Sequence, residues 1–467
     1  LSSSIVQKLL TLAYFIVVAR VFGPEEQGRY SVAIAFATLF SVFIDLGLSS
    51  ALTRETARDE TRAKEYLGQM FLARITLGVL VYGMIVGSAM LLGYSHELVS
   101  MIMIAGIASV IDPVTSSCWF MIRGFRNLLY ESIGSIAAIV GMMIIGIGAV
   151  ILHLPVIALV YAVLFGSCVN LVISLVTVFV RARIPLIIRP NMQTLRYLAL
   201  ISLPFAGAAI FSRGITFSDV TILTKIAGEQ AVGWYTAGNK LVLALNVIPG
   251  SIAASLYPAL SSYFVSAPEK LSQLTAKAFF FLLLVSVPLG LGIAITSPVI
   301  VSLFYGADYL PTVPILTFLG FSLIFSFLAF PFGSLLAAAN RQKTNTLVFG
   351  VAALVNVVGN YILISWYGAL GASITSLLTT AVLMILSGWF VRHTLVSHAR
   401  ILVWQGFRII ASGCIMALVL TALVARGVPL GILIFTGVCV YVACILLTRT
   451  ITIKELLEVR DSFLRAR

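Results

Sequence analysis

Long apolar runs separated by short polar breaks fill the chain from its start to about residue 448. Most runs are close to the ~20 residues that an apolar helix needs to cross a bilayer. Two runs, 197–224 and 273–300, are longer and contain Pro or Gly, which predicts tilted or broken helices. The pattern predicts fourteen membrane spans, at 1–19, 30–50, 66–92, 98–121, 128–151, 156–180, 197–224, 232–256, 273–300, 311–338, 344–365, 369–391, 403–425 and 428–448.

The composition excludes several classes of protein. The residues AVILMFWYC make up 60% of the 467 positions, only 10% are charged, and the mean hydropathy is +1.09. A soluble protein has about 45–50% apolar and about 25% charged residues. The chain is therefore not a soluble enzyme, a disordered chain or a disulfide scaffold, but an all-α polytopic membrane protein without room for an extramembrane domain. Its five cysteines lie in apolar stretches and are predicted to be packing residues.

The positive charges alternate from loop to loop. A net charge of +13 suggests nucleic acid as a partner, but the placement of the charges indicates membrane topology instead. The loops after even-numbered spans and the C-terminal tail hold 21 Lys and Arg residues, and the loops after odd-numbered spans hold 4. Since positive loops stay in the cytoplasm, both termini are predicted to be cytoplasmic. The basic tail 449–467 is predicted to lie on anionic inner-leaflet lipids.

A sequence repeat relates the first two spans to the seventh and eighth. Residues 23–30 read GPEEQGRY and residues 228–235 read GEQAVGWY, so two glycines and a tyrosine recur at an offset of 205. The same offset aligns Lys8 with Arg213. Six spans per repeat is an even number, so the two lobes must have the same orientation, related by a pseudo-two-fold along the membrane normal. The predicted parts are lobes 1–190 and 191–400, with spans thirteen and fourteen appended in 401–467.

Charges inside spans gather on the four spans that the repeat makes equivalent. A charge at the bilayer centre is costly and usually faces a cavity or a partner. Polar residues at helical spacing place these charges on one stripe of each helix, which predicts the wall of a central hydrophilic chamber. The predicted substrate-binding residues are Lys8, Arg213, Lys240, Asn239 and Asn246. The candidates for binding a coupling ion are Asp219, Asp45 and Asp112.

Other interpretations stay open for several of these residues. Lys8 could extend to the cytoplasmic surface, Asp45 could be interfacial, and Asp219 could simply pair with Lys225 or Arg213. Charges close to the cytoplasmic ends are interpreted as membrane anchors: Arg74, Glu131 and Arg408. Because cations outnumber carboxylates, an anionic ligand such as a pyrophosphate is favoured. No catalytic constellation, metal cluster or cofactor site can be assembled, so the protein is predicted not to be an enzyme.

The loop motifs resemble a known family. The segments 19–31 (ARVFGPEEQGRYS) and 45–55 (DLGLSSALTRE) are similar to the polysaccharide repeat-unit flippases of the multidrug/oligosaccharidyl-lipid/polysaccharide exporter superfamily. The resemblance covers essentially the whole chain. It implies translocation of undecaprenyl-pyrophosphate-linked oligosaccharides from the inner to the outer leaflet of a bacterial or archaeal cytoplasmic membrane. It also implies alternating access driven by an ion gradient, for surface polysaccharide biosynthesis, and polysaccharide polymerase or export proteins as partners.

Three alternatives are retained. A lipid II flippase is the first, although related lipid II flippases carry additional arginines where the second span here offers Asp45. A drug/cation antiporter of the same superfamily is the second, and it should have an acidic or aromatic chamber. A membrane polymerase or ligase of lipid-linked sugars is the third, and it usually needs a large outer loop, whereas the longest one here, about 297–313, has no Lys, Arg or His.

Overall fold

The computed structural model describes residues 2–49, 52, 63–124, 129–182, 191–339, 341–395 and 399–450, and these are almost entirely helical. No strand occurs in these ranges. The helices are α1 (Ser2–Asp45), α3 (Ala63–Leu91), α4 (His96–Gly124), α5 (Leu129–Ile151), α6 (Ile157–Val176, continued by the π-helical turn Thr177–Arg181), α7 (Met192–Leu245), α8 (Val247–Ser266), α9 (Pro268–Phe304), α10 (Thr312–Ala338), α11 (Gln342–Tyr367), α12 (Ala369–Leu395), α13 (Ala399–Val424) and α14 (Leu430–Leu447). The predicted all-α membrane fold is confirmed.

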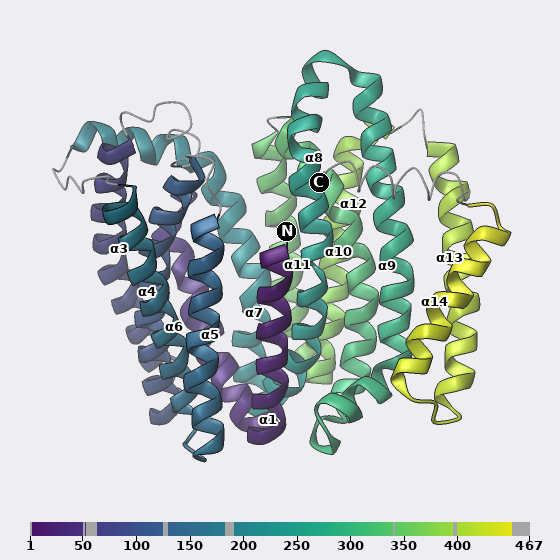
Figure 1. Cartoon of the computed structure of the whole chain (residues 1–467), viewed down its shortest axis with the longest axis horizontal. Helices are drawn as coiled ribbons and strands as arrows, with labels where there is room; N and C mark the ends of the chain where they lie inside the picture. The colour runs from purple at the N-terminus through teal and green to yellow at the C-terminus, as the bar shows by residue number, and fades with distance from the viewer. Residues whose placement is uncertain are drawn as a thin grey trace. The chain divides into compact units, whose positions relative to one another are not determined.

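Two helices each contain two predicted spans. Within the described ranges, twelve stretches are long and apolar enough to cross a membrane, and two of them, Ile5–Asp45 and Ala206–Phe264, have 41 and 59 residues. At 1.5 Å per residue, 41 residues would extend about 60 Å, twice the hydrocarbon thickness of roughly 30 Å. Each reverses direction at a glycine, and Figure 1 shows α1 turning in this way. Counting each as two spans gives the fourteen that the hydrophobic pattern predicts.

The two reversals have the same backbone conformation. Gly23 has φ 75° and ψ 175°, and Gly228 has φ 85° and ψ 176°. A side chain with a Cβ atom is strained at such φ values, so both positions require glycine. The two residues are 205 positions apart, which is the offset of the sequence repeat. The repeat is therefore a structural repeat of a helix, a glycine reversal and a second helix.

The first compact unit contains residues 1–240 together with 345–372. Within it, α1 packs against α3, α4, α5 and α6, and α5 packs against α6. Small residues allow close approach: a Cβ atom on Gly166 of α6 would lie 2.9 Å from the Ala138 carbonyl oxygen of α5. Such contacts are the usual basis of helix association in membranes, where burial of apolar surface gives little driving force.

The second compact unit contains residues 241–344 and 373–467. Here α9 and α10 cross closely at Gly290 and Gly320, and α8 packs on both helices. The two predicted appended spans, α13 and α14, pack on α9, where the Tyr441 hydroxyl donates to the Leu284 carbonyl at 2.9 Å. The compact units do not follow the repeat, since they group residues 192–240 and α11 with the first six spans. The lobe boundaries at 190 and 400 therefore stay a prediction.

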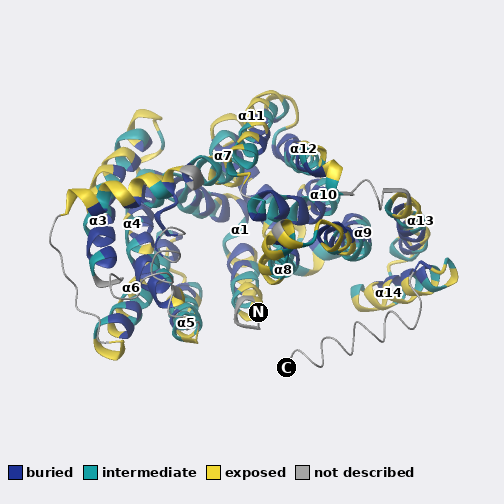
Figure 2. Ribbon diagram, turned by 90° about the horizontal axis from the view of Figure 1, so that it is seen from above, coloured by how far each residue is buried: buried dark blue, intermediate teal, exposed yellow. Residues whose placement is uncertain are grey.

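Large apolar side chains are exposed along helices of both units. Figure 2 shows exposed positions on α11 and α14, and the exposed fraction of the Trp366 side chain is 72%. In water such surfaces would drive association, whereas in a bilayer they contact lipid at little cost. The exposure pattern therefore agrees with a multi-pass membrane protein.

Candidate functional site

Two of the predicted basic residues lie close together in the first unit. Lys8 of α1 and Lys240 of α7 are both exposed, and they are near enough for their like charges to repel each other. The Lys240 ammonium lies 5.6 Å from the ring centre of Phe15. Neither lysine forms an ion pair with a carboxylate in the described part of the chain. Two neighbouring ammonium groups without a counter-ion favour binding of an anion between them.

Arg213 is also exposed and free of carboxylate partners among the described residues. Its guanidinium lies 5.8 Å from the ring centre of Phe217, one helical turn further along α7. Asn239 is half-buried on the same helix, next to Lys240. Asn246 belongs to the second unit, where its side-chain oxygen accepts a 3.3 Å hydrogen bond from Ser326 of α10. The structure thus places the charges of Lys8 and Lys240 within reach of each other, and substrate binding by all five residues of the set stays a prediction.

Asp219 is the most enclosed carboxylate of the predicted set. It is buried in α7 and accepts hydrogen bonds from the Tyr235 hydroxyl at 2.6 Å and from the amides of Asn356 and Asn360 at 2.9 and 2.6 Å. Ser218 donates to the Asn356 side-chain oxygen at 2.7 Å. These donors replace the water that a carboxylate loses on burial.

No cation neutralises Asp219 within the described ranges. The sequence left open that Asp219 pairs with Lys225 or Arg213, but in the structure both cations have other contacts. Lys225 instead donates to the Leu92 carbonyl, and its ammonium lies 3.8 Å from the ring centre of Tyr94. The side-chain oxygen of Asn360 is buried and has no hydrogen-bond partner among the described residues. A buried carboxylate beside an unpaired amide oxygen offers oxygen ligands to a proton or a small cation.

Sequence reasoning missed three of the partners of Asp219. Tyr235 was noticed only as part of the repeat, and Asn356 and Asn360 were not considered at all. The signal was available, because two asparagines four residues apart lie on one face of an otherwise apolar span. What the sequence lacks is the pairing of α11 with α7, which brings residues 137 and 141 positions apart into contact.

Asp45 is already neutralised by a cation. Arg74 of α3 is fully buried and forms an ion pair with Asp45 of α1. The guanidinium also donates to the hydroxyls of Ser49 and Ser117, both at 2.6 Å, and to the Pro113 carbonyl. The interpretation of Arg74 as an anchor at the membrane surface is therefore wrong: its charge is held inside the bundle by several acceptors. This network ties α1, α3 and α4 together and leaves Asp45 less available to a mobile ion.

Asp112, Glu131 and Arg408 have simpler surroundings. Asp112 of α4 is exposed, and Ser167 of α6 lies near its carboxylate. Glu131 pairs with Arg123, a contact between the end of α4 and the start of α5. Arg408 lies over the ring of Trp404, with 5.2 Å between its guanidinium carbon and the ring centre. Asp112 therefore stays a candidate for ion coupling.

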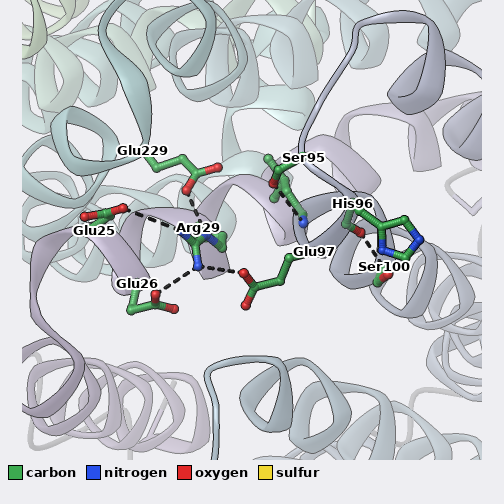
Figure 3. A network of polar contacts seen from close by, with 9 residues as sticks. Glu25, Glu26, Arg29, Ser95, His96, Glu97, Ser100 and Glu229 are labelled. Atoms are coloured by element: carbon green, nitrogen blue, oxygen red, sulfur yellow. Dashed lines mark hydrogen bonds and ion pairs between the residues drawn. The ribbon is translucent and has the colours of Figure 1, made fainter.

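A second cluster of charges lies at the glycine reversals, in segments where the hydrophobic pattern predicts loops between spans. Figure 3 shows the Arg29 guanidinium among four glutamates. The nitrogen–oxygen distances are 2.8 Å to Glu229 of α7, 2.9 Å to Glu26, 3.0 Å to Glu97 of α4 and 3.5 Å to Glu25. The cluster joins helices of both repeats.

The two reversals also touch each other through their glycines. A Cβ atom on Gly28 would lie 1.8 Å from the carbonyl oxygen of Glu229, and a Cβ atom on Gly233 would lie 1.8 Å from that of Pro24. Both pairs are related by the repeat offset, so each repeat makes the same contact with the other, as across a two-fold axis. Any side chain larger than hydrogen would force the two reversals apart.

Comparisons with known proteins agree with this architecture. Residues 1–264 match the family described as "Polysaccharide biosynthesis protein", and residues 204–362 match the MatE family. A Shigella flexneri protein named "Putative O-antigen transporter" is 22% identical over 373 residues, which covers 76% of this chain and 87% of that protein.

Solved structures show the same fold. An inward closed conformation of the lipid II flippase MurJ matches with a TM-score of 0.77 and 16% identity, covering 95% of this chain and 96% of that one. An inward-facing multidrug resistance MATE family transporter of the MOP superfamily matches with a TM-score of 0.70 and 18% identity, covering 84% and 95%. At these identities the match concerns the two-lobe fold alone.

Proposed function

The chain belongs to the polysaccharide biosynthesis protein family, and we propose that this membrane transporter flips undecaprenyl-pyrophosphate-linked oligosaccharides from the inner to the outer leaflet. The observation that carries the proposal is the pair of neighbouring, unneutralised lysines, Lys8 and Lys240. A charge inside a membrane bundle is retained only where a cavity or a ligand compensates its cost. A pyrophosphate between the two ammonium groups would supply that compensation.

Arg213 is the third proposed contact with the headgroup. It carries the charge of Lys8 at the equivalent position of the other repeat, and a planar guanidinium suits a phosphate oxygen pair. Phe217 lies beside Arg213 and is half-buried, and its ring is proposed to contact a sugar next to the phosphates. Asn239 and Asn246 are proposed to contact the polar part of the substrate.

Alternating access driven by an ion gradient is the proposed mechanism, and Asp219 is the coupling carboxylate that the geometry favours. It is buried, and its donors are neutral, so its charge can be balanced by a proton or a small cation. A cation that binds only one conformation shifts the population toward that conformation by its difference in affinity. Asp45 is less suited because Arg74 already balances its charge.

The same buried carboxylate also favours one alternative, an antiporter that exchanges drugs or other cations for an ion. In that case the substrate would be cationic and Lys8 and Lys240 would oppose its binding. The lipid II flippase stays a second alternative, with the same headgroup chemistry. A polymerase or ligase is disfavoured, because only residues 305–311 connect α9 to α10, and three of them form a short 3-10 helix.

The test is neutralisation of the basic residues one at a time. Lys8→Gln and Arg213→Gln should each reduce export of surface polysaccharide by about tenfold or more, since each removes a charge-assisted contact of roughly 1.5–3 kcal/mol. Lys343→Gln is the matched control, because Lys343 is an exposed lysine at the start of α11, outside the predicted stripes. Normal export by both variants at normal abundance would contradict the proposal.

The substrate is identified by reconstitution. Purified protein in liposomes is given lipid-linked sugars, lipid II or a cationic dye, under a proton or a sodium gradient. Movement of lipid-linked repeat units alone supports the proposal, and movement of lipid II or of the dye supports the corresponding alternative. The cytoplasmic termini and a partnership with polymerase or export proteins stay predictions. The basic segment 449–467, which is predicted to lie on anionic lipids, falls almost entirely outside the described residues.

A further inference from the structure

We propose that the two glycine reversals form a closure of the outer mouth of the transporter, and that the ion pair between Arg29 and Glu229 latches it. We call residues 23–29 and 228–233 the glycine seam. The inference rests on the proposed transport function and on the predicted orientation, which places both reversals outside the cytoplasm. It concerns the conformational cycle and not the binding of substrate.

The glycine contacts hold the two reversals so close together that no side chain fits between them. Gly28 and Gly233 each place their Cα atom against a carbonyl oxygen of the opposite repeat, and a Cβ atom would lie 1.8 Å from it. Packed backbone of this kind is either in contact or separated, because interfaces of close-packed groups are bistable and do not deform continuously. The seam therefore has two states rather than a range of openings.

The partners of Arg29 divide into two groups. Glu25, Glu26 and Glu97 belong to the same repeat as Arg29 and would move with it, whereas Glu229 belongs to the other repeat. When the seam separates, Arg29 loses only Glu229 and keeps three carboxylates. The latch can consequently open without leaving an unpaired guanidinium, which would be costly in a partly buried position.

A second contact between the repeats fastens the same region. Lys225 of α7 donates to the Leu92 carbonyl, in the turn between α3 and α4, and lies 3.8 Å from the ring centre of Tyr94. Glu97, a partner of Arg29, lies in the first turn of the helix that follows, α4. The turn at 92–97 is thus held by a cation from each repeat. Opening the seam must release the Lys225 contact as well.

The test is accessibility of a buried reporter. Gln27 is fully buried within the seam, and the equivalent residue of the second repeat, Val232, is also fully buried. In a variant whose five cysteines are replaced, Gln27→Cys is exposed to a membrane-impermeant maleimide applied from outside to intact cells without substrate. Val232→Cys is an independent reporter, so a failure of one to fold does not end the test.

The distinguishing comparison uses two glutamates that touch the same guanidinium. Glu229→Gln should raise the labelling rate of either reporter by about fivefold to tenfold, a change of roughly 1–1.4 kcal/mol in the balance of closed and open states. Glu97→Gln should leave the rate unchanged, because Glu97 moves with Arg29. Equal effects of the two variants, or no effect of Glu229→Gln with either reporter, would overturn the latch.

Charge exchange sharpens the result. Arg29→Glu should raise labelling further, and adding Glu229→Arg should restore much of the closed state, because the seam again pairs opposite charges. Failure of the exchange to reduce labelling would argue against a latch across the repeats. Labelling needs no transport, so a confirmed latch in a protein that moves no lipid-linked sugar would refute the proposed function and leave the latch standing.

Discussion

The two repeats share a backbone but differ in the chemistry that it carries. In the second repeat, Asp219 accepts a hydrogen bond from Tyr235 at 2.6 Å. At the offset of 205, the equivalent residues of the first repeat are Tyr14 and Tyr30. A phenol therefore occupies the position of the carboxylate, while the second tyrosine is kept in both repeats.

The surroundings of the two positions differ accordingly. Asp219 is met by asparagine amides from α11, whereas the Tyr14 hydroxyl is buried without a hydrogen-bond partner among the described residues. Gly146 of α5 makes room for the ring: a Cβ atom there would lie 2.1 Å from the Tyr14 hydroxyl oxygen. One repeat packs an aromatic ring against a glycine, and the other encloses a charge among polar donors. The repeat therefore preserves the helix reversal and its packing, while the buried carboxylate with neutral donors occurs at this position in the second copy alone.

The largest expected effect comes from removing the charge of Asp219, and the matched change in the first repeat is removal of the Tyr14 hydroxyl. Asp219→Asn should reduce transport by about a thousandfold, because a carboxylate and a cation some 4 Å apart attract with about 4 kcal/mol at a protein-like dielectric. Tyr14→Phe should leave transport within about twofold, since its hydroxyl has no partner to lose. Transport of a lipid-linked sugar into the outer leaflet of liposomes measures both, and similar losses would contradict the assignment of coupling to the second repeat.

The symmetric part of the structure should respond equally on both sides. Gly28→Ala and Gly233→Ala should each destabilise the protein by about 1–3 kcal/mol, because the added methyl group meets a backbone carbonyl that cannot move away. Gly83→Ala is the control, since nothing lies within 4 Å of its Cβ position. Thermal unfolding in detergent measures the three variants. A clear difference between the two seam variants would show that the contact is not equivalent in the two repeats.

The shared tyrosine gives an intermediate effect. Tyr235→Phe should shift the ion concentration that gives half-maximal transport by about tenfold, as expected for loss of a hydrogen bond to a charged group worth about 1.5 kcal/mol. Tyr30→Phe should have almost no effect, because the Tyr30 hydroxyl makes no hydrogen bond in the described part of the chain. The measurement is the dependence of transport on the concentration of the driving ion, and an equal shift for both variants would remove the distinction between the repeats.

The smallest effect on transport is expected at Ser218, which does not contact the Asp219 carboxylate but hydrogen-bonds to its partner Asn356. Ser218→Ala removes a 2.7 Å hydrogen bond to Asn356, which orients the amide that donates to Asp219. Loss of one neutral hydrogen bond of about 1 kcal/mol should shift the apparent ion affinity by about fivefold at most. The same ion titration measures it, and an effect larger than that of Tyr235→Phe would mean that Ser218 itself binds the ion.

The sequence by itself determined the class of fold, the fourteen spans and the repeat, because hydrophobic length and glycine reversals are local properties of the chain. It also identified Lys8, Lys240 and Asp219 as unusual, since any charge in an apolar span is unusual wherever its helix packs. Only the tertiary structure decided which group each charge contacts. Asp45 pairs with Arg74, which is 29 positions away, and Asp219 accepts a hydrogen bond from Asn356 of α11, which is 137 positions away. The physical reason is that the cost of a buried charge is visible in one helix, whereas its compensation comes from whichever helix packs beside it.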